Sequence, residues 1–176
     1  MKRIALILLA VCSSCAAADQ PESARTTAAF EIPLPTPADK QAFLTIVREE
    51  ASRVGYHLDA STPDELRQLS EVSPITMNAA VWRGNDDEAV ASAMDGADHL
   101  GFVWFSFSKG TQPELVASFR DRVMRRVSAR WSQTTRLPIM PTGAIPLRRD
   151  LVRTSSGYEI DPREKGKYQL EAVPGK

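Results

Sequence analysis

The position of the two cysteines limits how this chain can be held together. Both, Cys12 and Cys15, lie within the first fifteen of 176 residues, and no thiol follows them. A disulfide, a cysteine-ligated zinc and a cysteine nucleophile are therefore excluded from everything downstream. The fold must rely on a hydrophobic core. With 43% hydrophobic residues, the chain has the composition of an ordinary globular domain.

Residues 1–18 contain the three parts of an export signal in the usual order. Met1-Lys2-Arg3 is basic, the stretch from Ile4 to Val11 is apolar, and Ala16-Ala17-Ala18 supplies the small residues before a cleavage site. The apolar stretch is too short to span a bilayer, which takes about 20 residues. The alternative, a buried N-terminal strand, does not explain this order. We therefore predict a signal peptide over 1–18.

The same region resembles the lipobox of bacterial lipoproteins, in which the lipid-bearing cysteine directly follows a Leu-small-small run. Cys12 has leucine at −3 but Val11 at −1, whereas Cys15 follows two serines but has Cys12 in the leucine position. The resemblance implies lipidation at Cys15 or Cys12. With Ala16 after Cys15, it also implies sorting to the outer membrane. Cleavage after Ala18 without a lipid is the alternative, and it would leave the protein in the periplasm.

The remainder of the chain divides by composition into three parts. Residues 19–35 are small and polar and then punctuated by proline, which predicts a flexible tether. Residues 36–160 carry the apolar periodicity of a single globular domain, and 161–176 form a charged tail. For the domain we predict an α+β or α/β fold, with about four helices packed on a mixed sheet of three to five strands and a C-terminal β-hairpin.

Four helix starts share one chemistry, a side-chain oxygen acceptor with an acid three residues later. The four acceptors are Thr36, Thr62, Asn85 and Thr111. They predict helices over 37–54, 63–71, 86–97 and 113–131. The third segment could instead be a strand returning from a turn at Gly84-Asn85. The spacing of Val90, Ala93 and Met94 favours a helix there.

Strands are predicted from β-branched and aromatic runs. The run from Leu100 to Phe107 is apolar on both faces, which is typical of a central strand. Further strands are expected at 75–83 and, more weakly, at 56–59. The segments 147–153 and 158–160 flank Ser155-Ser156-Gly157 and predict the hairpin.

Charge and histidine content exclude several function classes. Lysine plus arginine and aspartate plus glutamate number 22 each, so net attraction to nucleic acid is not expected. His57 with Asp59 on one strand face, or Asp98 with His99, could supply a general base, although surface histidines are the ordinary interpretation. The consecutive acids at 86–88 fit a helix start better than a calcium loop. We predict no metal site and no cofactor.

The predicted helix over 113–131 is rich in arginine. A helical projection places Arg122 and Arg125 opposite the valines, Arg126 and Arg130 beside the apolar stripe, and Arg120 within it. A solvated face with snorkelling stems is the simplest interpretation, and docking to an acidic surface is the alternative. Arg120 on the buried side would need a carboxylate partner.

The stretch 137–147 contains three prolines yet is apolar. Proline at this density excludes a helix and a central strand. The segment either covers the core or presents its side chains to a partner in a preformed extended conformation. The candidate partner-binding residues are Trp131, Ile139, Met140, Thr142, Gly143, Ile145, Arg148 and Arg149.

These observations predict an exported cell-envelope protein, anchored to the membrane through an N-terminal lipid, whose mature domain is a non-enzymatic protein-binding module. An accessory subunit of an envelope assembly and an inhibitor or immunity protein both fit this description. The expected partner is another envelope protein. The alternatives are a small periplasmic hydrolase using a His/Asp pair, and a carrier of a small apolar ligand with the proline-rich segment as its lid.

Overall fold

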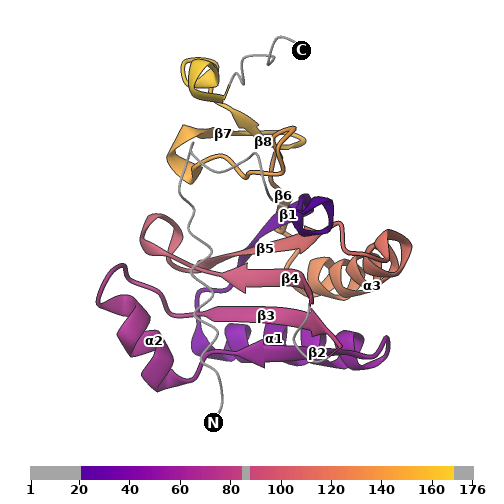
Figure 1. Ribbon diagram of the computed structural model, residues 1–176. Helices are drawn as coiled ribbons and strands as arrows, with labels where there is room; N and C mark the ends of the chain where they lie inside the picture. The colour runs from indigo at the N-terminus through magenta and orange to yellow at the C-terminus, as the bar shows by residue number, and fades with distance from the viewer. Residues whose placement is uncertain (1–20, 85–87, 169–176) are drawn as a thin grey trace.

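The computed structural model describes residues 21–84 and 88–168, and within them it has an α+β fold (Figure 1). The helices are α1 (Pro37–Ser52), α2 (Pro63–Ser70) and α3 (Pro113–Arg130). The strands are β1 (Thr26–Pro33), β2 (Tyr56–Ala60), β3 (Asn78–Arg83), β4 (Glu88–Met94), β5 (Phe102–Ser108), β6 (Thr135–Arg136), β7 (Leu151–Thr154) and β8 (Gly157–Ile160). Short 3₁₀ turns are η1 (Glu22–Ala24), η2 (Ala97–His99), η3 (Arg148–Asp150) and η4 (Lys165–Tyr168). The α+β class is confirmed, with one helix fewer and more strands than predicted.

The main sheet has six strands in the order β2-β3-β4-β5-β1-β6, and its pairings are antiparallel. The predicted mixed sheet is therefore wrong within the described residues. The run from β3 through β5 is joined by short connections, which favour antiparallel neighbours because a parallel pair needs a long crossover. Strand β1 lies between β5 and β6 and pairs with β5 from Thr26↔Ser108 to Pro33↔Phe102.

Helices α1 and α3 lie side by side on one face of this sheet, behind it in the view of Figure 1. Alternate residues of β5 point toward them, among which Phe105 lies 5.2 Å from the ring of Phe43 in α1. The ring of Phe119 in α3 lies 5.5 Å from that of Tyr56 in β2. These aromatic contacts form the centre of the main core, and their edge-on geometry suits the quadrupoles of the rings.

Two of the predicted helix starts carry the expected caps. The Thr36 hydroxyl accepts the Asp39 N–H at the start of α1, and Thr62 forms a capping box with Glu65 at the start of α2. Helix α3 begins after Gln112 without a side-chain cap. The Thr111 hydroxyl instead donates to the Glu88 carboxylate at 2.9 Å.

The third predicted helix, over 86–97, is wrong, because residues 88–94 form strand β4. This strand pairs with β3 on one side and β5 on the other, so its backbone is satisfied by the sheet. Its small side chains, such as Ala91 and Ala93, are buried against the helix layer. The spacing of its apolar residues favours a helix only weakly, and the hydrogen bonds to strands on both sides outweigh it. Asn85 and the acids at 86 and 87 lie outside the described residues.

The predicted tether over 19–35 is also wrong in its second half, since β1 occupies residues 26–33 in the interior of the sheet. Ala28, Ala29 and Ile32 are buried there. The stretch looked small and polar because alanine is a weak strand signal and Glu31 interrupts the apolar run. Its ladder partner in β5 is about 70 to 80 residues away, so no local pattern specifies the pairing.

The predicted C-terminal hairpin is confirmed as β7 and β8, which turn at Ser155-Ser156 and Gly157. The predicted charged tail over 161–176 is held against the domain at its start. The Asp161 N–H donates to the Asp150 carbonyl at 2.8 Å, and the Tyr168 hydroxyl donates to the Asp150 carboxylate at 2.6 Å. The chain is thus attached through Tyr168, and 169–176 lie outside the described residues, as do 1–18 with Cys12 and Cys15.

Candidate functional site

The proline-rich segment leaves the sheet at β6 and is fixed at both ends. Leu137 is buried and its N–H continues the ladder by donating to the Ala29 carbonyl at 2.9 Å. Pro146 is buried at the other end, directly before η3. Between these points Ile139 and Met140 stay half-exposed. The segment is therefore a held loop with an accessible tip.

A tight turn holds the tip against the N-terminal part of the chain. Gly143 has φ +89°, a conformation that favours glycine, and its N–H donates to the Met140 carbonyl at 2.8 Å. A Cβ at this position would lie 2.7 Å from Cγ of Arg25. The Arg25 guanidinium in turn donates to the Pro141 carbonyl. The glycine in the predicted site is therefore a packing residue.

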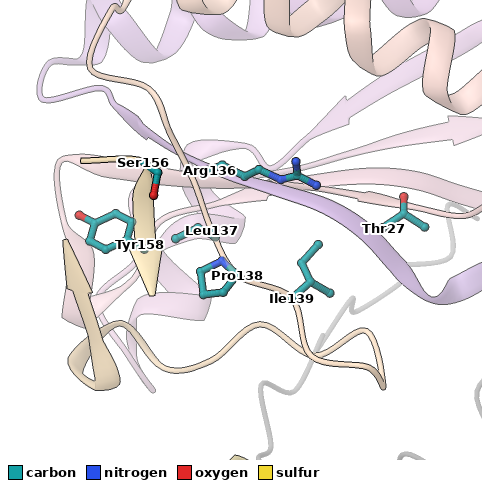
Figure 2. Close-up of a pocket in the computed structure, with 7 residues that line it drawn as sticks. All are labelled: Thr27, Arg136, Leu137, Pro138, Ile139, Ser156 and Tyr158. Atoms are coloured by element: carbon teal, nitrogen blue, oxygen red, sulfur yellow. The ribbon is translucent and has the colours of Figure 1, made fainter. Parts of the chain in front are cut away.

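Two surface hollows meet at this loop. The first, of about 370 Å³, is lined by Thr27, Arg136, Leu137, Pro138, Ile139, Ser156 and Tyr158. Figure 2 shows Pro138 and Ile139 between Tyr158 and Ser156 on one side and Thr27 on the other. The second, of about 440 Å³, is lined by Glu22, Arg25, Thr26, Thr27, Lys109, Ile139, Met140 and Pro141. Ile139 and Thr27 therefore belong to both hollows.

A buried carboxylate holds the segment that follows the loop. Glu31 of β1 is 3% exposed and accepts hydrogen bonds from three side chains. They come from Arg148 Nε at 2.8 Å, the Tyr158 hydroxyl at 2.6 Å and Trp104 Nε1 at 3.0 Å. Burial alone raises the pKa of Glu31. The bonds from Arg148, Tyr158 and Trp104 together outweigh burial and hold this pKa below its usual range. Glu31 is therefore an ionised attachment point for η3 and β8.

His99 lies beside this cluster and does not form the predicted catalytic pair. Its ring stacks on Trp104 at 4.8 Å between centroids, and neither ring nitrogen makes a hydrogen bond with the described residues. Burial lowers the pKa of His99 and favours the neutral ring at pH 7. Asp98 is exposed. His57 and Asp59 lie on β2, three strands away from β5 in the sheet order.

The structure divides the predicted partner-binding residues into contact and support groups. Ile139 and Met140 line the hollows, and Arg149 is exposed. Thr142 and Ile145 are half-buried flanks of the turn. Arg148 is turned inward onto Glu31, with its guanidinium 5.2 Å from the Phe102 ring. Arg148 therefore orients the segment.

Trp131, like Gly143, is a predicted contact residue that the structure buries. It is 9% exposed, packs against Phe43 at 6.4 Å, and donates from Nε1 to Asp39 at 3.3 Å. An apolar stripe on α3 ends at this residue, which explains why it turns into the core. Its assignment as a contact residue needs correction.

The arginines of α3 are also arranged differently from the helical projection. Arg122 and Arg126 both approach Glu50 of α1, at 3.5 and 2.9 Å. Arg120 pairs with its neighbour Asp121 at 2.8 Å, which provides the expected carboxylate. Arg125 is exposed, as predicted. The predicted basic strip is therefore largely neutralised by carboxylates.

Sequence reasoning missed Glu31, Trp104 and Tyr158 as members of the site. The signal that could have revealed Glu31 was its place inside the apolar run Ala28-Ala29-Phe30-Glu31-Ile32, where a lone carboxylate requires donors. Trp104 and Tyr158 gave no local signal. Their positions depend on strand pairings between distant segments.

Neither a metal cluster within the described part of the chain nor a known relative points to a function for the candidate site. The described residues contain no group of three or more histidine, cysteine, aspartate or glutamate side chains placed to hold a metal ion. No protein-family model matches the chain, and a search of curated proteins finds no match. The candidate site is thus defined by its own geometry, as a held apolar loop tip between two open hollows.

Proposed function

We propose that the folded domain is the protein-binding part of an exported, lipid-anchored cell-envelope protein, and that the loop tip at 138–141 makes the contact. The observation that carries the proposal is the position of Ile139, which borders both hollows. A partner side chain on each side of this residue would find a preformed recess. Because the loop is already held by Leu137 and the turn at Gly143, little conformational entropy is lost on binding.

The charges around the hollows indicate the chemistry of the partner. Arg136 borders the first hollow and Arg25 the second, and both are exposed. Neither forms a salt bridge within the part of the chain that the structure describes. Lys109 at the second hollow is paired with Glu22. The surface therefore suits a segment of another envelope protein that combines an apolar side chain with carboxylates.

The open form of the hollows favours a protein contact over the two alternatives. A carrier would enclose its apolar ligand, whereas both hollows face solvent and include charged residues at their borders. A hydrolase using Asp98 and His99 would need a hydrogen-bonded pair, and His99 is instead stacked on Trp104. These observations support a binding module and leave the partner to be identified by experiment.

The envelope location rests on the export pattern of residues 1–18. Among the described residues, no helix is long and apolar enough to cross a bilayer. A lipid on Cys15 or Cys12 would supply the attachment. Membrane fractionation of Cys15→Ser, Cys12→Ser and the double variant tests it. Loss of sedimentation in at least the double variant is expected, and unchanged sedimentation of all three would contradict the anchor.

The binding surface is tested by capture from envelope extract with two matched variants. Ile139→Asp places a charge between the hollows and should abolish capture of the specific partner. Val72→Asp makes the same kind of change at an apolar residue that is 94% exposed, and it should leave capture intact. Arg136→Glu should weaken capture, more so at low salt. Equal capture by Ile139→Asp and Val72→Asp would refute the proposed surface.

A further inference from the structure

The two edges of the six-stranded sheet are protected to different degrees. The β6 edge has two residues, is followed by Pro138, and has Gly157 of β8 close to the Arg136 carbonyl. The β2 edge has five residues without proline or lysine, and its pairing with β3 has no bulge. Edges of soluble proteins are usually blunted by such devices. Within residues 21–84 and 88–168, no strand pairs with the outer edge of β2.

The backbone groups that β2 turns outward follow from its register. The Ser61 N–H donates to the Asn78 carbonyl at 2.9 Å, which makes this opposed pair a hydrogen-bonded one. Hydrogen-bonded pairs alternate in an antiparallel ladder, so His57 and Asp59 also turn their backbone groups toward β3. Tyr56, Leu58 and Ala60 consequently direct their N–H and C=O groups away from the sheet.

We propose that β2 pairs antiparallel with β2 of a second copy of this chain, around a two-fold axis at Leu58. In this register Leu58 of each copy exchanges both backbone hydrogen bonds with the other, and Tyr56 does so with Ala60 of the second copy. His57 then lies opposite Asp59 of the second copy as a non-hydrogen-bonded pair, in which side chains approach most closely.

Side-chain complementarity selects a second copy as the occupant, because an imidazole N–H of His57 can donate to an Asp59 carboxylate. His57 and Asp59 are exposed on the same side of β2, the side away from α1 and α3. Pairing around Leu58 places His57 of each copy opposite Asp59 of the other, so the dimer contains two such contacts. A one-residue slip in register would lose the match and turn the side chains to the opposite face.

The dimer would carry two copies of the proposed binding loop at its ends. Strand β6, from which the loop leaves, is the last strand at the edge opposite β2. One continuous sheet would therefore run through both copies, with both loops far from the new interface. Dimer formation and partner binding can be tested separately.

Sedimentation equilibrium of the full chain in density-matched detergent tests the dimer. The wild type should show a reversible monomer–dimer equilibrium. His57→Asp places two carboxylates opposite each other at two positions in the dimer. It should therefore raise the dissociation constant roughly tenfold. His57→Asp combined with Asp59→His restores two His/Asp pairs in reversed order and should restore association. Glu71→His, an exposed change outside β2, serves as the control and should have no effect.

A backbone variant tests the interface without relying on charge. Leu58→Pro removes an N–H that points away from β3, so the ladder within one copy keeps its hydrogen bonds. The variant should be monomeric, with the circular dichroism of the folded wild type. A wild type that stays monomeric at every concentration would overturn the proposal. So would dimers that survive both Leu58→Pro and His57→Asp.

Discussion

Glu50, between α1 and α3, and Glu31, beneath the C-terminal segment, are both buried carboxylates that arginine neutralises, but the regions around them differ. Glu50 is 1% exposed and is approached by Arg53, Arg122 and Arg126, which are themselves partly exposed. The two helices also share an apolar core. Around Glu31, neither strand of the C-terminal hairpin has a buried residue.

The elements on the two sides of the sheet are therefore stabilised by different interactions. The helix side is stabilised by many apolar contacts, so the ion pairs around Glu50 supply a smaller share of its stability. The C-terminal side is stabilised by a few polar attachments, at Glu31, Asp150 and Asp161. Losing one such attachment should open that segment locally, because little apolar surface remains to hold it.

The largest effect is expected from the helix-side core. Phe105→Ala removes a ring that contacts Phe43 and Phe107, and it leaves a cavity under both helices. We expect a loss of about 3–5 kcal/mol in the free energy of unfolding. Urea denaturation followed by circular dichroism should show one cooperative transition at lower urea. An early separate transition of the helices would contradict a single helix-side core.

The next prediction compares the two glutamates directly. Glu31→Gln removes the charge that Arg148 needs and should cost on the order of 3 kcal/mol, mostly as local opening. Glu50→Gln should cost about 1 kcal/mol, because α1 and α3 keep the apolar core that they share when these ion pairs are weakened. Hydrogen exchange should show early loss of protection in β7 and β8 for the first variant only. An equal loss of protection throughout the chain in both variants would show that the two glutamates do not differ in this way.

Lowering the pH should destabilise the C-terminal segment before the helix layer. The bonds from Arg148, Tyr158 and Trp104 hold the pKa of Glu31 below its usual range despite burial, and the Tyr168 hydroxyl does the same for Asp150. Arg163 lowers the pKa of Asp161 to about 2. A folded-state pKa below the unfolded one gives stability that is fully present above the unfolded value, near 4.5 for Glu31. That stability is lost as the pH falls through the folded value.

We therefore expect the C-terminal segment to lose stability once the pH falls below about 4.5, the unfolded pKa of Glu31, and to open before the helix layer unfolds. Tyr158 is half-buried beside Glu31, so its fluorescence can be followed with Trp104 during an acid titration. Glu31→Gln serves as the control, since it should flatten the first acid transition. A single transition in the wild type, with the same midpoint in the variant, would show that Glu31 does not control the opening.

The sequence predicted helices α1 and α3 and the C-terminal hairpin, but it did not predict how the hairpin is attached to the sheet, and the reason is physical. Local capping chemistry at Thr36 and Thr62 and the apolar spacing of α1 and α3 are carried by nearby residues, so they can be found in one sequence. The placing of β1 and the three donors around Glu31 depend on contacts over 70 residues or more. The proline-rich loop was recognisable by composition. Its support by Glu31 was not, because a lone carboxylate does not indicate which distant donors it will meet.

The smallest expected effect tests whether the arginines of α3 matter only where they meet Glu50. Arg125 is exposed and forms no salt bridge among the described residues, so Arg125→Ala should change the free energy of unfolding by less than about 0.5 kcal/mol. Arg126 pairs with both Glu49 and Glu50, so Arg126→Ala should cost more, about 1 kcal/mol. Urea denaturation of the two variants side by side measures the difference. Because the two residues are adjacent on one helix and lose the same side chain, helix propensity cancels. A cost at Arg125 as large as at Arg126 would mean that α3 is stabilised by its overall charge, and the contrast with Glu31 would then rest on the apolar core alone.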